Sequence, residues 1–240
     1  MATKCFIPIL GKRLRFTRLT ENGSLPEGSE ANDAVVVTKG FVTINLTSEV
    51  EDGIEIIQRN ASGGLCVNEK FSDLFKRFNV EIEFCGVNPS LLSMITNAEP
   101  YEDYNGDIAG FTVPEGEIDK TFALELWTGL SSSYEGPETG GYMLLPRVSG
   151  GVLGDIEIDG ENAITFSLTG ASTEGGNKWG TGPFEVVLGE DIEDNGDMVP
   201  GDPSVLPTGL DPLDHLLLMT TGVAAPPSEC DPTSLDPVSD

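Results

Sequence analysis

Apolar and polar residues alternate along several segments of the chain, with the period of two that is typical of half-buried β-strands. The clearest segments are Val35–Thr47, Asn79–Cys85, Thr121–Trp127 and Ala163–Thr169. Further strands are expected at Arg13–Leu19, Ile54–Arg59, Tyr142–Arg147 and Phe184–Leu188. Each segment has one apolar and one polar face, which an antiparallel sheet with one side in water requires. The pattern therefore predicts a mainly β protein.

Two of these strands supply a candidate polar surface, made of Thr43, Asn45, Glu81 and Glu83. Their apolar neighbours of opposite parity, Ile44, Ile82 and Phe84, are needed for the core. Because the period of two fixes the face, a slip of one residue would bury both glutamates. We therefore expect the four polar side chains to lie together on the solvent face of the sheet.

Helix signals are sparse, and the best one covers residues 88–96. Asn88 is a suitable N-cap, and Pro89 suits the first helical position. Leu91, Leu92 and Ile95 then form a short apolar stripe. A second helical turn is expected at Asp73–Phe78, so the sheet should be flanked by little helix.

The segment Ser48–Gly63 is expected to be an exposed loop and hairpin between two strands. Its acidic and turn-forming residues indicate an excursion away from the core. The residues that define it are Glu49, Glu51, Asp52, Gly53 and Ile54.

Composition changes near Gly189, which divides the chain into residues 1–189 and an acidic, proline-rich segment 190–240. The second part has too few regularly spaced apolar residues for a core of its own, so we expect it to dock on a neighbouring subunit. Exposed ion pairs contribute only about 0–1 kcal/mol each, so an apolar anchor should supply most of the energy. The candidates for this anchor are Leu213, Leu216 and Leu217. The acidic residues are expected to meet a basic N-terminal arm of a neighbouring subunit at Lys12, Arg13 and Arg15.

The charge balance is strongly acidic, with 40 Asp and Glu against 13 Lys and Arg in 240 residues and a formal net charge of -27. A protein that grips nucleic acid needs Lys and Arg to neutralise phosphates, so this composition argues against tight binding of DNA or RNA. It is compatible with a surface along which DNA slides.

Signals for catalysis are absent or weak. His215 is the single histidine, and the chain contains no GxSxG, HExxH, GxxxxGKS or GxGxxG motif. Paired carboxylates for glycoside hydrolysis leave no unambiguous mark in a sequence, but aromatic residues, which would stack on sugar, make up only 7% of the chain. We therefore expect no enzyme activity and no cofactor.

The run from Asp191 through Glu193 and Asn195 to Gly196 has the alternating oxygen ligands of a calcium loop, with Asp202 at the twelfth position. Pro200 interrupts it and no flanking helices are evident, so an acidic turn is the alternative, and we expect no metal site. The cysteines Cys5, Cys66, Cys85 and Cys230 are widely spread, without zinc spacing, which favours reduced thiols. No apolar stretch suggests a signal peptide or a membrane span.

Several segments together resemble the major tail proteins of bacteriophages that infect actinobacteria. No single segment is specific, but their order and spacing from about Arg13 to Leu188 are characteristic. They are Leu14–Gly23, Thr38–Leu46, Gly53–Gly63, Phe84–Leu92, Tyr142–Val148 and Trp179–Phe184.

The resemblance implies a non-contractile tail tube protein, made in the host cytoplasm and built into the tail of the virion. It implies a two-sheet β-sandwich with one flanking short α-helix, whose inner sheets join into the β-barrel of a homohexameric ring. Rings would stack into a tube around the tape measure protein, with tail terminator and distal tail proteins at the two ends. The tube would conduct double-stranded DNA without binding it specifically.

On this expectation Thr43, Asn45, Glu81 and Glu83 face the channel, and the Ser48–Gly63 excursion contacts the next ring. Two other functions fit the same pattern. One is a tail terminator or neck ring of the same fold, and the other is a β-sandwich decoration or binding module.

Overall fold

Nine antiparallel strands form one continuous hydrogen-bonded sheet in the computed structural model, which describes residues 8–86, 88–130, 140–158, 164–194, 197–229 and 231–235. Its strands are β1 (Pro8–Arg18), β2 (Val35–Thr38), β3 (Phe41–Glu51), β6 (Leu74–Phe84), β9 (Thr121–Leu130), β10 (Gly140–Ser149), β11 (Val152–Glu157), β12 (Thr165–Thr173) and β17 (Leu217–Thr221). The prediction of a mainly β protein is confirmed.

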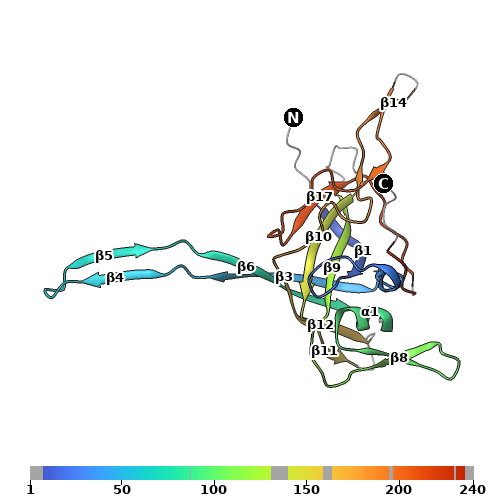
Figure 1. Ribbon diagram of the computed structural model, residues 1–240, viewed down its shortest axis with the longest axis horizontal. Coiled ribbons are helices and arrows are strands. Elements are labelled where there is room, and N and C mark those ends of the chain that lie inside the picture. The colour runs from blue at the N-terminus through green and yellow to red at the C-terminus, as the bar shows by residue number, and fades with distance from the viewer. Residues whose placement is uncertain are drawn as a thin grey trace.

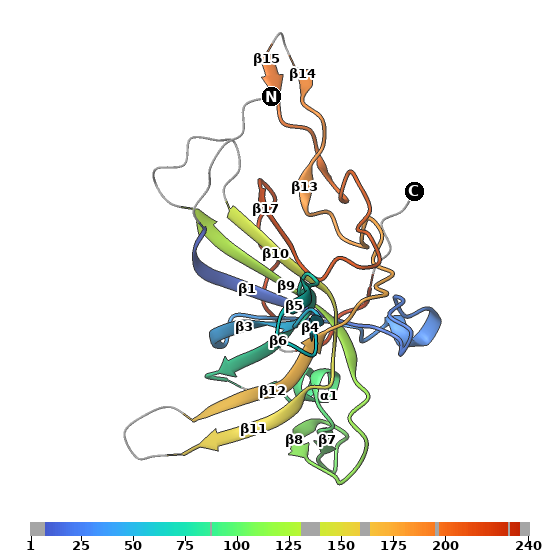
Figure 2. The same cartoon turned by 90° about the vertical axis from the view of Figure 1, so that its left-hand side faces the viewer.

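The strand order is β2-β1-β9-β10-β12-β6-β3, with β11 beside β12 and β17 beside β10. The first half of β10 pairs with β17, whereas only Val148 and Ser149 at its end pair with β12. Figure 2 shows the result: β1, β9 and β10 lie on one side, and β3, β6, β12 and β11 lie on the other.

The main core lies between these two halves of the sheet. One half contributes Leu14, Phe16, Leu124 and Leu145, and the other contributes Val80, Ile82, Phe84 and Leu168. All of them are almost completely buried. The expected alternation in β3 and β6 is therefore confirmed: Ile82 and Phe84 are buried, and Ile44 packs against the same core.

The helix expected near residue 88 is confirmed as α1 (Pro89–Ile95), and it packs its apolar residues into the core. The Asn88 side chain accepts a hydrogen bond from the Ser90 N–H at 2.9 Å, as an N-cap should. The helical turn expected at Asp73–Phe78 is wrong, because those residues belong to β6 and its approach.

Four two-stranded sheets complete the described structure. They are β4 (Glu55–Arg59) with β5 (Leu65–Lys70), β7 (Glu99–Glu102) with β8 (Ile108–Thr112), β13 (Val187–Leu188) with β16 (Pro203–Ser204), and β14 (Ile192–Asp194) with β15 (Asp197–Val199). A 3-10 helix, Gly28–Ala31, precedes β2. The predicted strand Phe184–Leu188 is reduced to β13, and Ala163 lies outside the described residues.

The expectation that each strand has one wet face is wrong for β9. A second apolar cluster covers its other face and that of β10, with Trp127, Tyr142 and Leu144 packed against Trp179, Val186 and Leu206. The covering residues come from the segment that follows β12. Local alternation around Glu125 gives no sign of this cover, because the covering chain is far away in the sequence.

Candidate assembly interface

The four residues predicted to form a polar surface lie together on one face of β3 and β6. Thr43 stands opposite Glu83, and Asn45 stands opposite Glu81. The Asn45 side-chain amide lies 3.5 Å from the Glu81 carboxylate. Glu81 is exposed and Glu83 is half-buried, so neither lies in the core. That this face lines a channel stays a prediction.

The same polar surface continues across β12 and β11. Thr165, Ser167, Thr169 and Asp155 line one shallow depression together with the four predicted residues. Glu83 is paired with Ser167 across β6 and β12. The alternation of Thr165, Ser167 and Thr169 with apolar neighbours was a usable signal for these additions, whereas Asp155 had none.

The strands β11, β12, β6 and β3 therefore form a four-stranded unit with a polar outer face. Within the described part of the chain, β3 pairs only with β6, and β11 pairs only with β12. Both ends of the unit are thus open edges, with backbone groups positioned to pair with another strand.

A long arm extends this unit away from the body of the molecule (Figure 1). It continues the β3–β6 hairpin through the two-stranded ribbon β4–β5. The exposed excursion therefore ends at Asp73, just before β6, and not at Gly63 as expected. Every residue of β4 and β5 is exposed. The placement of Glu49 and Glu51 in a loop is wrong, because both residues belong to β3.

The arm carries large apolar side chains that nothing in the described chain covers well. Their exposed fractions range from 37% to 71%, and they are Val50, Ile54, Ile56, Ile57, Leu65, Val67, Phe71, Leu74 and Phe75. Scattered exposed apolar residues are ordinary, but a contiguous set of this kind marks an interaction surface. A two-stranded ribbon is also only marginally stable in water without a packed face.

Both faces of the ribbon are apolar. Ile56 and Ile57 are consecutive in β4, so their side chains point to opposite faces. Val67 is paired with Gln58, which places it on the face of Ile56. A partner that covered only one face would leave an isoleucine in water on the other.

A joint separates the ribbon from the base of the arm. The Gly53 N–H donates to the Asp73 carboxylate at 2.8 Å, and the Phe71 N–H donates to the Ile54 carbonyl at 3.0 Å. A Cβ at Gly53 would lie 1.9 Å from the Phe71 carbonyl oxygen, so the close approach of the two strands requires glycine. The Gly53 N–H, and then Lys70, lower the pKa of Asp73.

At the base of the arm, charged and aromatic side chains fix its direction. Glu49 pairs with Lys76 at 3.6 Å and with Arg77 at 3.2 Å. On the apolar side, the Phe75 ring lies 5.3 Å from the His215 ring in an edge-on arrangement, measured between centroids. The C-terminal segment therefore contacts the base of the arm within the same subunit.

Arg15 is expected at a contact between subunits, but its side chain is buried within its own subunit. Its guanidinium donates to both carboxylate oxygens of Glu125, at 2.6 and 2.5 Å, and the Tyr142 hydroxyl donates to the same carboxylate at 2.6 Å. The guanidinium carbon also lies 3.4 Å from the Phe184 ring centroid. Burial, with the neighbouring negative charge of Glu125, raises the pKa of Tyr142 well above its ordinary value. Lys12 is exposed and Arg13 is half-buried, so their place in a contact between subunits stays a prediction.

The expectation that Leu216 and Leu217 anchor the C-terminal segment on a neighbour also needs correction. Leu217 is in β17, which pairs with β10 of the same chain, and it packs on the second apolar cluster. Leu216 packs against the main core. Leu213 is 74% exposed and remains available for contact with another molecule.

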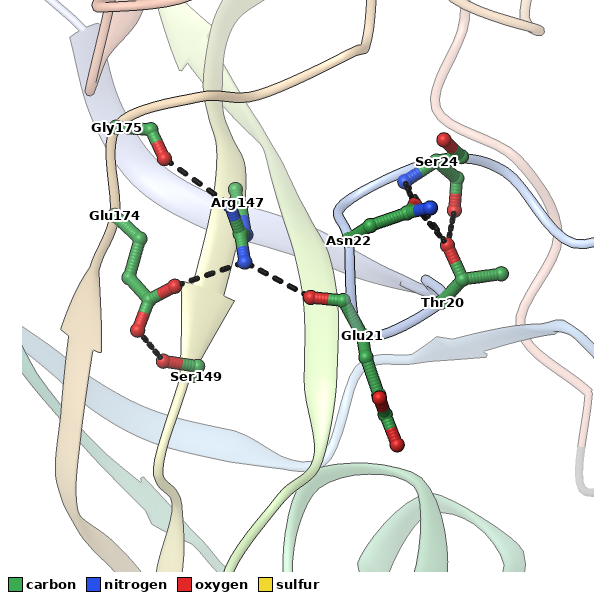
Figure 3. A network of polar contacts seen from close by, with 8 residues as sticks. All are labelled: Thr20, Glu21, Asn22, Ser24, Arg147, Ser149, Glu174 and Gly175. Carbon is green, nitrogen blue, oxygen red and sulfur yellow. Dashed lines mark hydrogen bonds and ion pairs between the residues drawn. The ribbon is translucent and has the colours of Figure 1, made fainter.

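Figure 3 shows how Arg147 of β10 ties three segments together. Its guanidinium donates to the Glu21 carbonyl at 2.9 Å and to the Gly175 carbonyl at 3.1 Å, and it pairs with the Glu174 carboxylate at 3.1 Å. The Ser149 hydroxyl donates to the other oxygen of Glu174. This network holds the end of β12 beside β10, and so positions the polar face.

Among the described residues there is no group of three or more His, Cys, Asp or Glu side chains placed to hold a metal ion. The possible calcium loop is the β14–β15 hairpin, whose Asn195 and Gly196 lie outside the described residues. Cys66 and Cys85 are exposed free thiols, while Cys5 and Cys230 also lie outside that part of the chain.

No protein-family model and no curated protein matches this chain. The described helices include none that is long and apolar enough to cross a membrane.

Proposed function

We propose that this chain is the structural subunit of a bacteriophage tail tube. Six copies form a ring, rings stack into a tube in the tail of the virion, and the tube conducts double-stranded DNA. The tape measure protein occupies the channel during assembly, and terminator and distal tail proteins close the two ends. The resemblance in sequence suggests this function, and the arm is the observation that carries it.

The arm supports contact between rings. A ribbon with apolar side chains on both faces needs a partner, and it reaches beyond the body to which it belongs (Figure 1). A second copy of the chain is the natural partner in a tube, because each subunit presents the same arm in the same direction. The ribbon then adds its apolar area to the next ring instead of leaving it in water.

The four-stranded unit supports contact within a ring. Pairing β3 of one subunit with β11 of the next removes both open edges and joins the units into a closed barrel. The two halves of the sheet then act as the two layers of a sandwich around the core of each subunit. The polar outer face becomes the lining of the barrel.

The charge of this lining is suited to DNA passage. Glu81, Glu83 and Asp155 carry the same sign as the phosphates, and Thr43, Asn45 and Ser167 are neutral. The residues that line this depression include no Lys or Arg to neutralise phosphates, so DNA does not adhere there.

Electron microscopy of the purified protein tests the proposal. Long tubes with a central channel are expected at high protein concentration. Single rings that never stack would instead favour the tail terminator, and monodisperse monomers would favour a decoration or binding module.

A further inference from the structure

The end strand β2 has a composition that favours pairing with a strand of another molecule. Its sequence, Val35–Thr38, follows Ala34 and contains no charge, and three of its residues are valine. It pairs with β1 on one side only among the named strands. Exposed end strands of this composition are templates for another chain, and natural proteins cover them or charge them.

The C-terminal residues of the same chain cover this edge. The Val35 N–H donates to the Thr233 carbonyl at 3.1 Å, and the Thr233 N–H donates to the Val35 carbonyl at 2.8 Å. The Leu235 N–H donates to the Ala31 carbonyl at 2.8 Å, and the Leu235 side chain is buried beside Ala34 and Val35. Both backbone groups of Val35 are therefore occupied.

The covering segment does not itself favour pairing with a further strand. Thr233 uses its backbone groups toward β2, so the residue next to it, Pro232, faces the other way. Proline has no N–H to donate to a further strand. The segment beside β2 is therefore a poor partner for a further strand.

We infer that residues 231–235 are a guard segment, which keeps β2 from pairing with β2 of a second copy. Two identical edges meeting antiparallel would form a two-fold contact that competes with ring formation. By occupying the edge of β2 at Val35, the guard segment leaves β3 and β11 as the edges at which copies meet. This last step rests on the proposed function, whereas the blocking of β2 does not.

Two shortened chains test the inference, at concentrations at which the full chain does not assemble. A chain that ends at Glu229 lacks the guard segment, and a chain that ends at Leu235 keeps it and is the matched control. Light scattering should show association of the shorter chain alone. Because backbone groups alternate in direction along a strand, Val36 and Thr38 face β1, whereas Val35 and Val37 face the open edge. Hydrogen exchange should show that this association protects the N–H groups of Val35 and Val37.

A point variant covers the case in which the shorter chain fails to fold. Thr233→Pro removes the N–H that bonds to Val35, and Thr233→Ala keeps it. Association of the proline variant alone is expected, again with protection of β2. Association no stronger than that of the full chain, or association that leaves the N–H groups of Val35 and Val37 unprotected, would overturn the inference. Failure of the full chain to form tubes would count against the proposed function and not against the guard segment.

Discussion

The strand β9 and the ribbon β4–β5 depart from the simple alternating pattern in opposite ways. Alternation alone would predict one buried face and one exposed face for each of them. In β9 both faces are dry, and Glu125 is completely buried. In the ribbon both faces are wet, although each carries an isoleucine.

The difference lies in what covers each face. The outer face of β9 is covered by residues of its own chain, from Trp179 to Leu206, that follow in the sequence. The ribbon projects away from the body of its subunit (Figure 1), so no distant segment of the described chain covers its apolar side chains. The buried apolar faces hold the subunit together, and on the function proposed above the exposed ones form its contacts with other copies.

Removal of the buried carboxylate should have the largest effect on stability. Glu125→Ala leaves the Arg15 guanidinium buried without its partner, which should lower the free energy of unfolding by about 3–5 kcal/mol. Urea denaturation of the unassembled subunit measures it. Glu49→Ala, which breaks exposed ion pairs at the base of the arm, is the control and should cost about 1 kcal/mol or less. Equal losses in the two variants would contradict the dry outer face of β9.

A leucine in the cover of β9 should have the next largest effect. Leu206 is 4% exposed, so Leu206→Ala should lower the free energy of unfolding by about 2–5 kcal/mol. Leu213→Ala, at a side chain that is 74% exposed, should change it by about 0.5 kcal/mol or less. If both variants unfold like the parent chain, the segment after β12 does not belong to the core of the subunit.

The sequence predicted those features whose causes are local. The N-cap Asn88 and the following Pro89 determine where α1 begins, and the alternation of Glu81, Ile82 and Glu83 determines the faces of β6. It did not predict the partners of Arg15 or Leu217, because Glu125 and β10 approach them only in the folded chain. Of the candidate assembly surface, alternation located the polar face. It did not give the length of the arm, which depends on the pairing of β4 with β5, a strand that the pattern did not predict.

Acidification should loosen the base of the arm through His215. The Phe78 N–H donates to the Thr173 hydroxyl at 2.9 Å, so that hydroxyl can donate to His215 Nδ1, 2.7 Å away. Burial, and then the nearby charge of Arg77, lower the pKa of His215, against a smaller opposing influence of Asp214. The folded state therefore binds the proton less well than the unfolded state. The contribution of neutral His215 is complete above pH 6.5 and is lost as the pH falls below it.

The variant His215→Asn keeps a hydrogen-bond acceptor for Thr173 and cannot titrate in this range. Its stability should fall less than that of the parent chain between pH 7 and pH 5.5, as measured by thermal denaturation. Parallel pH profiles would show that His215 does not respond to pH at this site.

Two neighbouring isoleucines give the sharpest test of the comparison, with the smallest expected effect on the subunit itself. Ile56→Asn and Ile57→Asn change exposed side chains on opposite faces of the ribbon, so each should alter the free energy of unfolding by about 0.5 kcal/mol or less. Each should nevertheless prevent tube growth in the electron microscope, because an amide buried against an apolar partner lacks its hydrogen bonds. Gln58→Asn, at a position that is already polar, is the control and should leave tubes intact.

Loss of tubes from one isoleucine variant alone would mean that a single surface of one neighbour receives the arm. Loss from both would mean that the arm lies between two surfaces, and normal tubes from both would remove the arm from the interface.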